Sequence, residues 1–162
     1  MAKFKISETI HSEKVKTVRL GTTTNKYGYN ENGKALKLTA ESRYELAAAG
    51  DPIEGYQQSS NFPEQGTVEG YAIGGMVSTG YKEVTFDGLQ ATPGTGVVAI
   101  GDFVLTGTVV AFGTALAGPL KVTKATSQSG AQALAYKARV VSLGSAGTGA
   151  VGTVGVVEFI QA

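Results

Sequence analysis

The feature that most constrains this chain is an uncharged run of eighteen residues, from Phe103 to Leu120. Its length approaches the roughly 20 predominantly apolar residues that a membrane-spanning helix needs. The run is broken, however, by residues that suit turns and strands better than a spanning helix: Thr106, Gly107, Thr108, Gly113, Thr114, Gly118 and Pro119. A second uncharged run, residues 140–157, has the same glycine and threonine content. We therefore expect no membrane span and predict that both runs form strands buried on both faces in one core.

Composition points to the same fold class. Glycine supplies 23 of the 162 residues, about twice its usual share of roughly 7%, and charged residues supply only 17%. Glycine is a poor helix former, and the many valines and threonines are typical of strands. Turn signals recur between short alternating segments. The sequence thus predicts an all-β protein, a compact β-barrel or sandwich of about eight to ten short strands with an extended N-terminal arm.

Alternation of apolar and polar residues indicates individual strands. Residues 35–38 form one such segment. In the stretch YKEVTFDG, Val84 and Phe86 are expected to face inward while their neighbours stay at least partly in water. A further strand is predicted where charged residues alternate with Leu134, Tyr136, Ala138 and Val140.

The segment from Ser42 to Tyr56 is ambiguous. Ser42 and Glu45 have the spacing of a capping box, and Gly50 followed by Pro52 would end a helix there. The same residues also fit two short strands around a turn at Gly50. The all-β surroundings favour the two strands, although helix propensity alone favours the helix.

Charge is unevenly distributed along the chain. Residues 1–45 carry nine Lys/Arg against five Asp/Glu (+4), residues 46–102 carry one against seven (−6), and residues 103–162 carry four against one (+3). We divide the chain into an extended N-terminal arm and loop, residues 1–30, and a single β-domain, residues 31–162. The asymmetry reflects either chance solvation of surface loops or a basic arm that meets an acidic surface on a neighbouring copy or partner.

Residues for catalysis or cofactor binding are scarce. The chain has no cysteine and one histidine, His11, so thiol chemistry and His- or Cys-based metal sites lack their ligands. Residues 147–152 match the pattern GxGxxG, but strand-forming residues follow where a dinucleotide site needs a helix. We expect an ordinary glycine loop there, no cofactor and no enzymatic activity. A net charge of +1 gives no reason to expect nucleic-acid binding.

Three stretches together resemble the small capsid decoration (cement) proteins of tailed bacteriophages: GKALKL followed by SRYELAAAGDPIEGY, then VVAIGDFVLTG, then YKARVVSLGSAGTGAVGTVGVVEFI. The likeness spans roughly residues 33–160. It implies a β-rich and usually trimeric protein on the outer capsid surface of the virion, where it clamps neighbouring major capsid subunits. It implies no catalytic residues.

From this resemblance we expect a structural virion protein, a homotrimer that binds the major capsid protein and stabilises the assembled head. The arm lies outside the resemblance; from its basic charge we expect it to contain the capsid-contact residues: Lys3, Phe4, Lys5, Ile6, Lys14, Lys16 and Arg19. The alternative is a head-fibre or tail adsorption protein that binds host-surface carbohydrate through exposed tyrosines such as Tyr27, Tyr29, Tyr56 and Tyr71.

Overall fold

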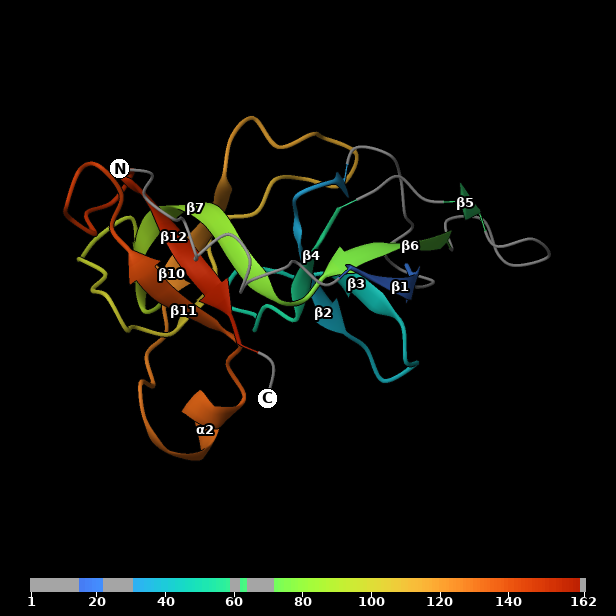
Figure 1. Ribbon diagram of the computed structural model, residues 1–162, viewed down its shortest axis with the longest axis horizontal. Helices are drawn as coiled ribbons and strands as arrows, with labels where there is room; N and C mark the ends of the chain where they lie inside the picture. Colours follow the sequence, from blue (N-terminus) through green and yellow to red (C-terminus); the bar gives the residue numbers. More distant parts are fainter. Residues whose placement is uncertain (1–14, 22–30, 59–61, 64–71, 161–162) are drawn as a thin grey trace, which may run out of the picture.

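The computed structural model describes residues 15–21, 31–58, 62–63 and 72–160 (Figure 1). These residues form two six-stranded β-sheets and one short helix, and the sheets lie side by side along the longest axis of the molecule. The all-β class expected from the sequence is confirmed. Strands β5 and β8 have only two residues each, which raises the number of strands above the eight to ten expected.

The first sheet comes from the N-terminal half of the chain. Its strands are β1 (Val15–Leu20), β2 (Ala35–Leu38), β3 (Tyr44–Leu46), β4 (Gly55–Gln57), β5 (Phe62–Pro63) and β6 (Ala72–Val77). Their order is β1-β3-β2-β4-β6-β5, and β1 also pairs with β6, so the sheet curls back on itself. Strand β1 pairs with β6 over all six residues. Part of the segment assigned to the arm is therefore a strand of this sheet.

The second sheet closes into a five-stranded barrel. Its strands are β7 (Gly80–Leu89), β8 (Thr92–Pro93), β9 (Val104–Thr106), β10 (Leu120–Lys124), β11 (Ala138–Ser142) and β12 (Val154–Phe159), in the order β11-β12-β7-β10-β9, with β8 beside β7. Phe103 forms a bridge with Arg139, and the Val140 N–H donates to the carbonyl of Asp102 at 2.9 Å. These contacts join the two outermost strands, so the barrel has no open edge at this point.

One apolar core connects the barrel to the first sheet. Val84 and Phe86 on β7 face inward, as the alternation predicted, and both are fully buried. Their cluster continues into the first sheet through Ile53, Tyr56 and Val77. A smaller cluster beneath β1 holds Val18, Leu20, Leu36 and Met76.

Gly155 on β12 shows how closely this core is packed. A β-carbon at Gly155 would lie 2.4 Å from the ring of Phe86 and 2.5 Å from the carbonyl oxygen of Ser142. Only glycine lets β12 pass over the aromatic ring at this distance. The glycine content of the chain therefore serves packing as well as turns.

The ambiguous segment after Ser42 is strand-turn-strand. Residues Tyr44–Leu46 form β3 and Gly55–Gln57 form β4, with a turn at Gly50, whose φ is +85°. Pairing with β2 on both sides outweighs the local helix signal. The favoured alternative is confirmed.

The strand predicted through Leu134 and Tyr136 is wrong in its first half. Residues Gly130–Leu134 form the short helix α2, and Leu134 is 81% exposed; only Ala138–Ser142 is a strand. The sequence AQAL contains good helix formers, so the apparent alternation there had no structural meaning. α2 has five residues, and the part of the chain that the structure describes contains no helix able to cross a membrane.

The prediction that both uncharged runs are strands buried on both faces also needs correction. Each run begins and ends in barrel strands but is a loop between them. We call residues 107–119, between β9 and β10, the long loop, and residues 143–153, between β11 and β12, the glycine loop. Most residues of both loops are exposed. Glycine, alanine and threonine carry no charge yet tolerate water, so a lack of charge did not require burial.

Candidate functional site

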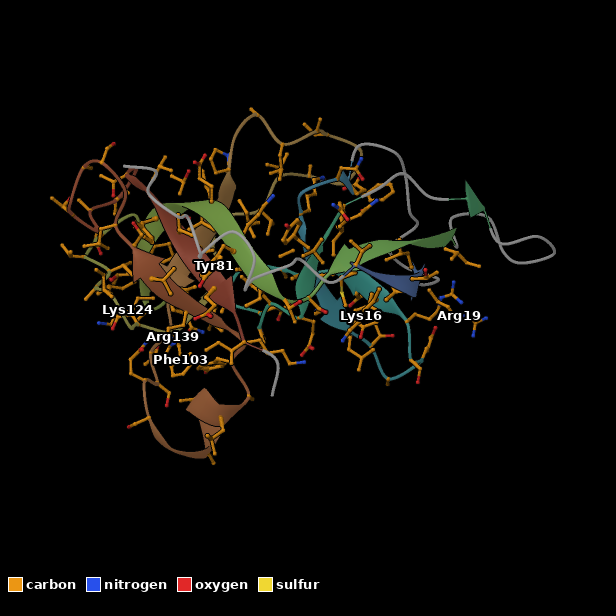
Figure 2. All side chains as sticks on the ribbon, viewed as in Figure 1. Lys16, Arg19, Tyr81, Phe103, Lys124 and Arg139 are labelled. Atoms are coloured by element: carbon orange, nitrogen blue, oxygen red, sulfur yellow. The ribbon has the colours of Figure 1, made fainter. Side chains whose placement is uncertain are left out.

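The predicted capsid-contact residues are only partly within the described structure. Lys3, Phe4, Lys5, Ile6 and Lys14 lie outside the described residues. Lys16 and Arg19 are both exposed on β1, at the end of the molecule away from the barrel residues Lys124 and Arg139 (Figure 2). Side chains alternate along a strand, so Lys16 lies on the side of Val18 while Arg19 points to the other face. The structure therefore does not combine Lys16 and Arg19 into one basic patch.

The long loop is the most unusual exposed element. It runs for thirteen residues without a strand and carries no charge, whereas most loops in compact domains are much shorter. Val109 is 47% exposed and Phe112 is 49% exposed. Figure 1 shows it, in orange, extending from the barrel toward the first sheet. Long loops of this kind in compact domains usually carry function.

A buried ion pair in the segment directly before β2 holds the middle of the long loop. Glu31 is fully buried and Lys34 is 5% exposed, and Lys34 Nζ lies 2.5 Å from Glu31 Oε2. Glu31 Oε1 accepts the N–H of Gly113 at 2.7 Å. Lys34 Nζ also donates to the carbonyl of Ala111 at 3.1 Å. The two side chains thus bind adjacent parts of the loop backbone, 77 and 82 residues away in the sequence.

Such a pair has an energetic cost that the loop contacts help to offset. Removing two charges from water costs several kcal/mol per ion, and the loss is recovered only when the remaining hydrogen-bonding positions are also filled. The carbonyl of Ala111 accepts one hydrogen bond from Lys34, and the N–H of Gly113 donates one to Glu31. We infer that the loop conformation and the ion pair stabilise each other.

The near end of the long loop is held by the barrel. Gly107 N–H donates to the carbonyl of Lys121 at 2.8 Å. Asp87, largely buried on β7, accepts the Thr108 N–H at 2.8 Å and also the Thr108 hydroxyl. These bonds at Thr108 and those at Ala111 and Gly113 hold the first half of the loop, so Val109 and Phe112 have a defined position.

Beneath the long loop lies a cavity of about 580 Å³ between the barrel and the first sheet. Most of its lining is apolar, with contributions from Leu46, Val109, Phe112, Leu116, Pro119 and Leu120. Its polar and charged lining consists of Lys34, Thr85, Thr106, Thr108 and Lys121. Among the described residues, the lining therefore includes two lysines and no carboxylate.

Three of the seven acids in the acidic segment, residues 46–102, are paired with lysines from other parts of the chain. Asp51 lies 2.7 Å from Lys37, Asp102 lies 2.8 Å from Lys124, and Glu54 pairs with Lys137. On the barrel exterior, Arg139 pairs with Glu158 at 3.3 Å. These acids consequently contribute little free negative charge to which a basic arm could bind.

One ionisable group in these pairs has a displaced pKa. The hydrogen bond with Asp51 raises the pKa of Lys37 above its usual 10.5, and the charges of Asp51 and Glu45 add to the effect, against a smaller opposing contribution from burial. Lys37 thus stays protonated over the whole physiological range.

Of the four tyrosines proposed for carbohydrate binding, only Tyr56 lies within the described residues. Tyr27, Tyr29 and Tyr71 lie outside the described residues. Tyr56 is 6% exposed, and the Lys82 ammonium lies 4.1 Å from the centre of its ring. A ring covered in this way offers no face on which a sugar can stack.

The GxGxxG segment belongs to the glycine loop and is followed by strand β12, as the sequence predicted. A β-carbon at Gly149 would lie 1.8 Å from the carbonyl oxygen of Val98, whose N–H donates to the carbonyl of Gly149 at 2.9 Å. The glycine is needed for this close backbone approach. Within the described ranges there is no group of three His, Cys, Asp or Glu side chains that could hold a metal, and His11 lies outside those ranges.

Sequence reasoning missed the Glu31–Lys34 pair. A usable signal was present: opposite charges three residues apart flank the Asn32-Gly33 turn, directly before a predicted buried strand. That signal does not reveal the loop partner, which lies far away in the sequence.

In comparisons with known proteins, no family model, no curated protein and no solved structure matches this chain.

Proposed function

We propose that this protein is a non-enzymatic decoration protein of a tailed bacteriophage, bound to the outer surface of the capsid. It contacts the major capsid protein and stabilises the assembled head by clamping neighbouring subunits. The proposal begins from the resemblance over residues 33–160 and is supported by the all-β fold, which offers broad loop surfaces. The resemblance implies a homotrimer, and a symmetric oligomer would multiply weak contacts through avidity.

The observation that carries the proposal is the uncharged long loop, held by hydrogen bonds, with Phe112 half exposed at its middle. Aromatic side chains are enriched among the residues that contribute most to protein interfaces. The buried Glu31–Lys34 pair holds the loop before any partner binds, which lowers the entropy lost on binding. We place the principal capsid contact on this loop, with the N-terminal arm as a second contact.

Clamping also explains how such a protein would stabilise a head. A ligand that binds only the assembled state shifts the equilibrium toward that state by mass action. No catalytic group is needed, and the extent and position of the contact surface decide the effect.

Binding to purified expanded capsids tests the proposal. Phe112→Ser should weaken co-sedimentation with capsids by about tenfold or more, the size of effect typical of a principal interface residue. Leu134→Ser is the matched control, because Leu134 is a more exposed apolar residue on α2. Electron microscopy of virions should place the protein on the head surface. Equal binding of the two variants would show that the long loop does not contact the capsid. Density confined to the tail would contradict the decoration function.

The arm is tested by a shorter deletion than the sequence alone suggests. Removing residues 2–20 would delete β1 together with the buried Val18 and Leu20. Deleting residues 2–14 removes Lys3, Phe4, Lys5, Ile6 and Lys14 and leaves β1 intact. We expect weaker capsid binding and unchanged stability of the domain; unchanged occupancy on capsids would argue against a role for the arm.

A further inference from the structure

The cavity beneath the long loop has the size of a small-molecule site. Its volume of about 580 Å³ lies in the range of roughly 300–1,000 Å³ that ligand sites occupy. The cavity is open to solvent, so a ligand of this size can enter it from the surface.

The lining indicates the chemistry of that occupant. Apolar side chains from the long loop and the first sheet form most of the wall, including Leu46, Phe112 and Leu116. Lys121, on β10, is exposed and is one of the lining residues, so its side chain is available to an anion at the cavity. Lys121 forms no ion pair with any acid in the described ranges, whereas Lys34 is already bound to Glu31 and Ala111. An apolar chain with one negative charge matches this arrangement.

A hydroxyl inside the site supports occupancy by something other than this chain. Thr106 is 1% exposed and lines the cavity, and its Oγ1 has no hydrogen-bond partner among the described residues. An unpaired buried hydroxyl is costly, so native structures usually supply a partner from protein, water or ligand. Thr106 can accept or donate one hydrogen bond to a molecule held beneath the loop.

From these observations we infer that the cavity binds a small anionic amphiphile, such as a medium-chain carboxylate, with its chain under the long loop and its carboxylate beside Lys121. Charge separates this occupant from a neutral hydrocarbon or a second copy of the chain: Lys34 is neutralised by Glu31, Lys121 adds a positive charge, and no acid is among the described lining residues. Contact with the underside of Phe112 and Leu116 would also brace the loop. The inference does not depend on capsid binding.

Titration of the full chain with decanoate, followed by calorimetry and by methyl resonances in NMR spectra, tests the site. We expect saturable binding of one decanoate per chain, with shifts at Leu46 and Leu116. Octanoate should bind about tenfold more weakly, because two fewer methylenes are buried. Decyltrimethylammonium, with the same chain length and the opposite charge, should bind more weakly still. Equal affinity for the cation and the anion, or no saturable binding, would overturn the inference.

Two variants place the ligand within the cavity. Lys121→Gln should reduce decanoate affinity about fivefold and leave decanol affinity unchanged, as expected for a partly exposed charge contact. The control is Lys16→Gln, an exposed lysine on β1 that does not line the cavity. Gly118→Leu should abolish binding of both probes, since Gly118 lines the cavity and a β-carbon there meets nothing within 4 Å. Unchanged binding in the folded Gly118→Leu variant would show that the probes bind elsewhere.

Discussion

The long loop and the glycine loop come from two uncharged runs of similar composition, and both connect neighbouring strands of the barrel. They are nevertheless held in different ways. The glycine loop is held partly by its own residues, where Thr153 Oγ1 donates to the carbonyls of Thr148 and Ala150. It is also held by backbone hydrogen bonds to distant parts of the chain, since Gly149 pairs with Val98 and the Gly152 N–H donates to the carbonyl of Phe86. The long loop depends on two buried charged side chains from the segment directly before β2. Both loops share their composition and both have contacts distant in the sequence; the buried charged side chains of Glu31 and Lys34 are what distinguish the long loop.

The largest expected effect tests that anchor. Glu31→Gln leaves Lys34 as a buried cation without its carboxylate, which should lower the free energy of unfolding by about 3–5 kcal/mol. Urea denaturation measures the change. Replacing both charges, as Glu31→Gln with Lys34→Met, should cost clearly less than the single change, because no unpaired charge remains. A loss below about 1 kcal/mol in the single variant would show that the pair does not hold the loop.

The second prediction concerns the glycine loop. Gly149→Ala places a β-carbon against the carbonyl of Val98 and should destabilise the fold by about 3 kcal/mol. The control is Gly152→Ala, where φ is +84° but a β-carbon meets nothing within 4 Å. That change should cost only the left-handed strain, about 1–2 kcal/mol. Equal losses of stability in the two variants, measured by thermal unfolding, would show that the close backbone approach at Gly149 does not add to the cost of the substitution.

A smaller effect is expected where the long loop meets the barrel. Asp87→Asn retains the shape of the side chain but weakens the charge-assisted bonds to Thr108, with an expected cost of about 1.5 kcal/mol. Amide hydrogen exchange should report faster opening of the long loop and little change in the glycine loop. Uniform acceleration across both loops would contradict independent anchoring.

The smallest effect contrasts a partly exposed ion pair with the buried one. The folded-state pKa of Lys37 is raised, so its pair with Asp51 contributes stability that is fully present below the unfolded pKa. That contribution is lost as pH rises through the raised folded pKa, above about pH 10.5. The free energy of unfolding should therefore fall more in the parent protein than in Lys37→Met between about pH 9 and pH 12. Identical pH profiles would assign the pair no net contribution.

Several features could be predicted from residues alone because they depend on local periodicity. Alternation around Val84 and Phe86 identified the inward face of β7, and turn residues around Gly50 supported strand-turn-strand. The same reasoning failed at Leu134, where alternation coincided by chance with a short helix. It also failed in the uncharged runs, since composition does not say which part of a run finds a strand partner.

By itself, the sequence determined the all-β class, because glycine, valine and threonine in short alternating segments disfavour helices. It also determined where several turns lie. Only the tertiary structure decided that Glu31 and Lys34 are buried, that they hold a loop some 80 residues away, and that a cavity forms beneath it. The physical reason is that local sequence patterns depend only on residues that are close together along the chain. Contacts across large sequence separations depend on how the two sheets pack against each other.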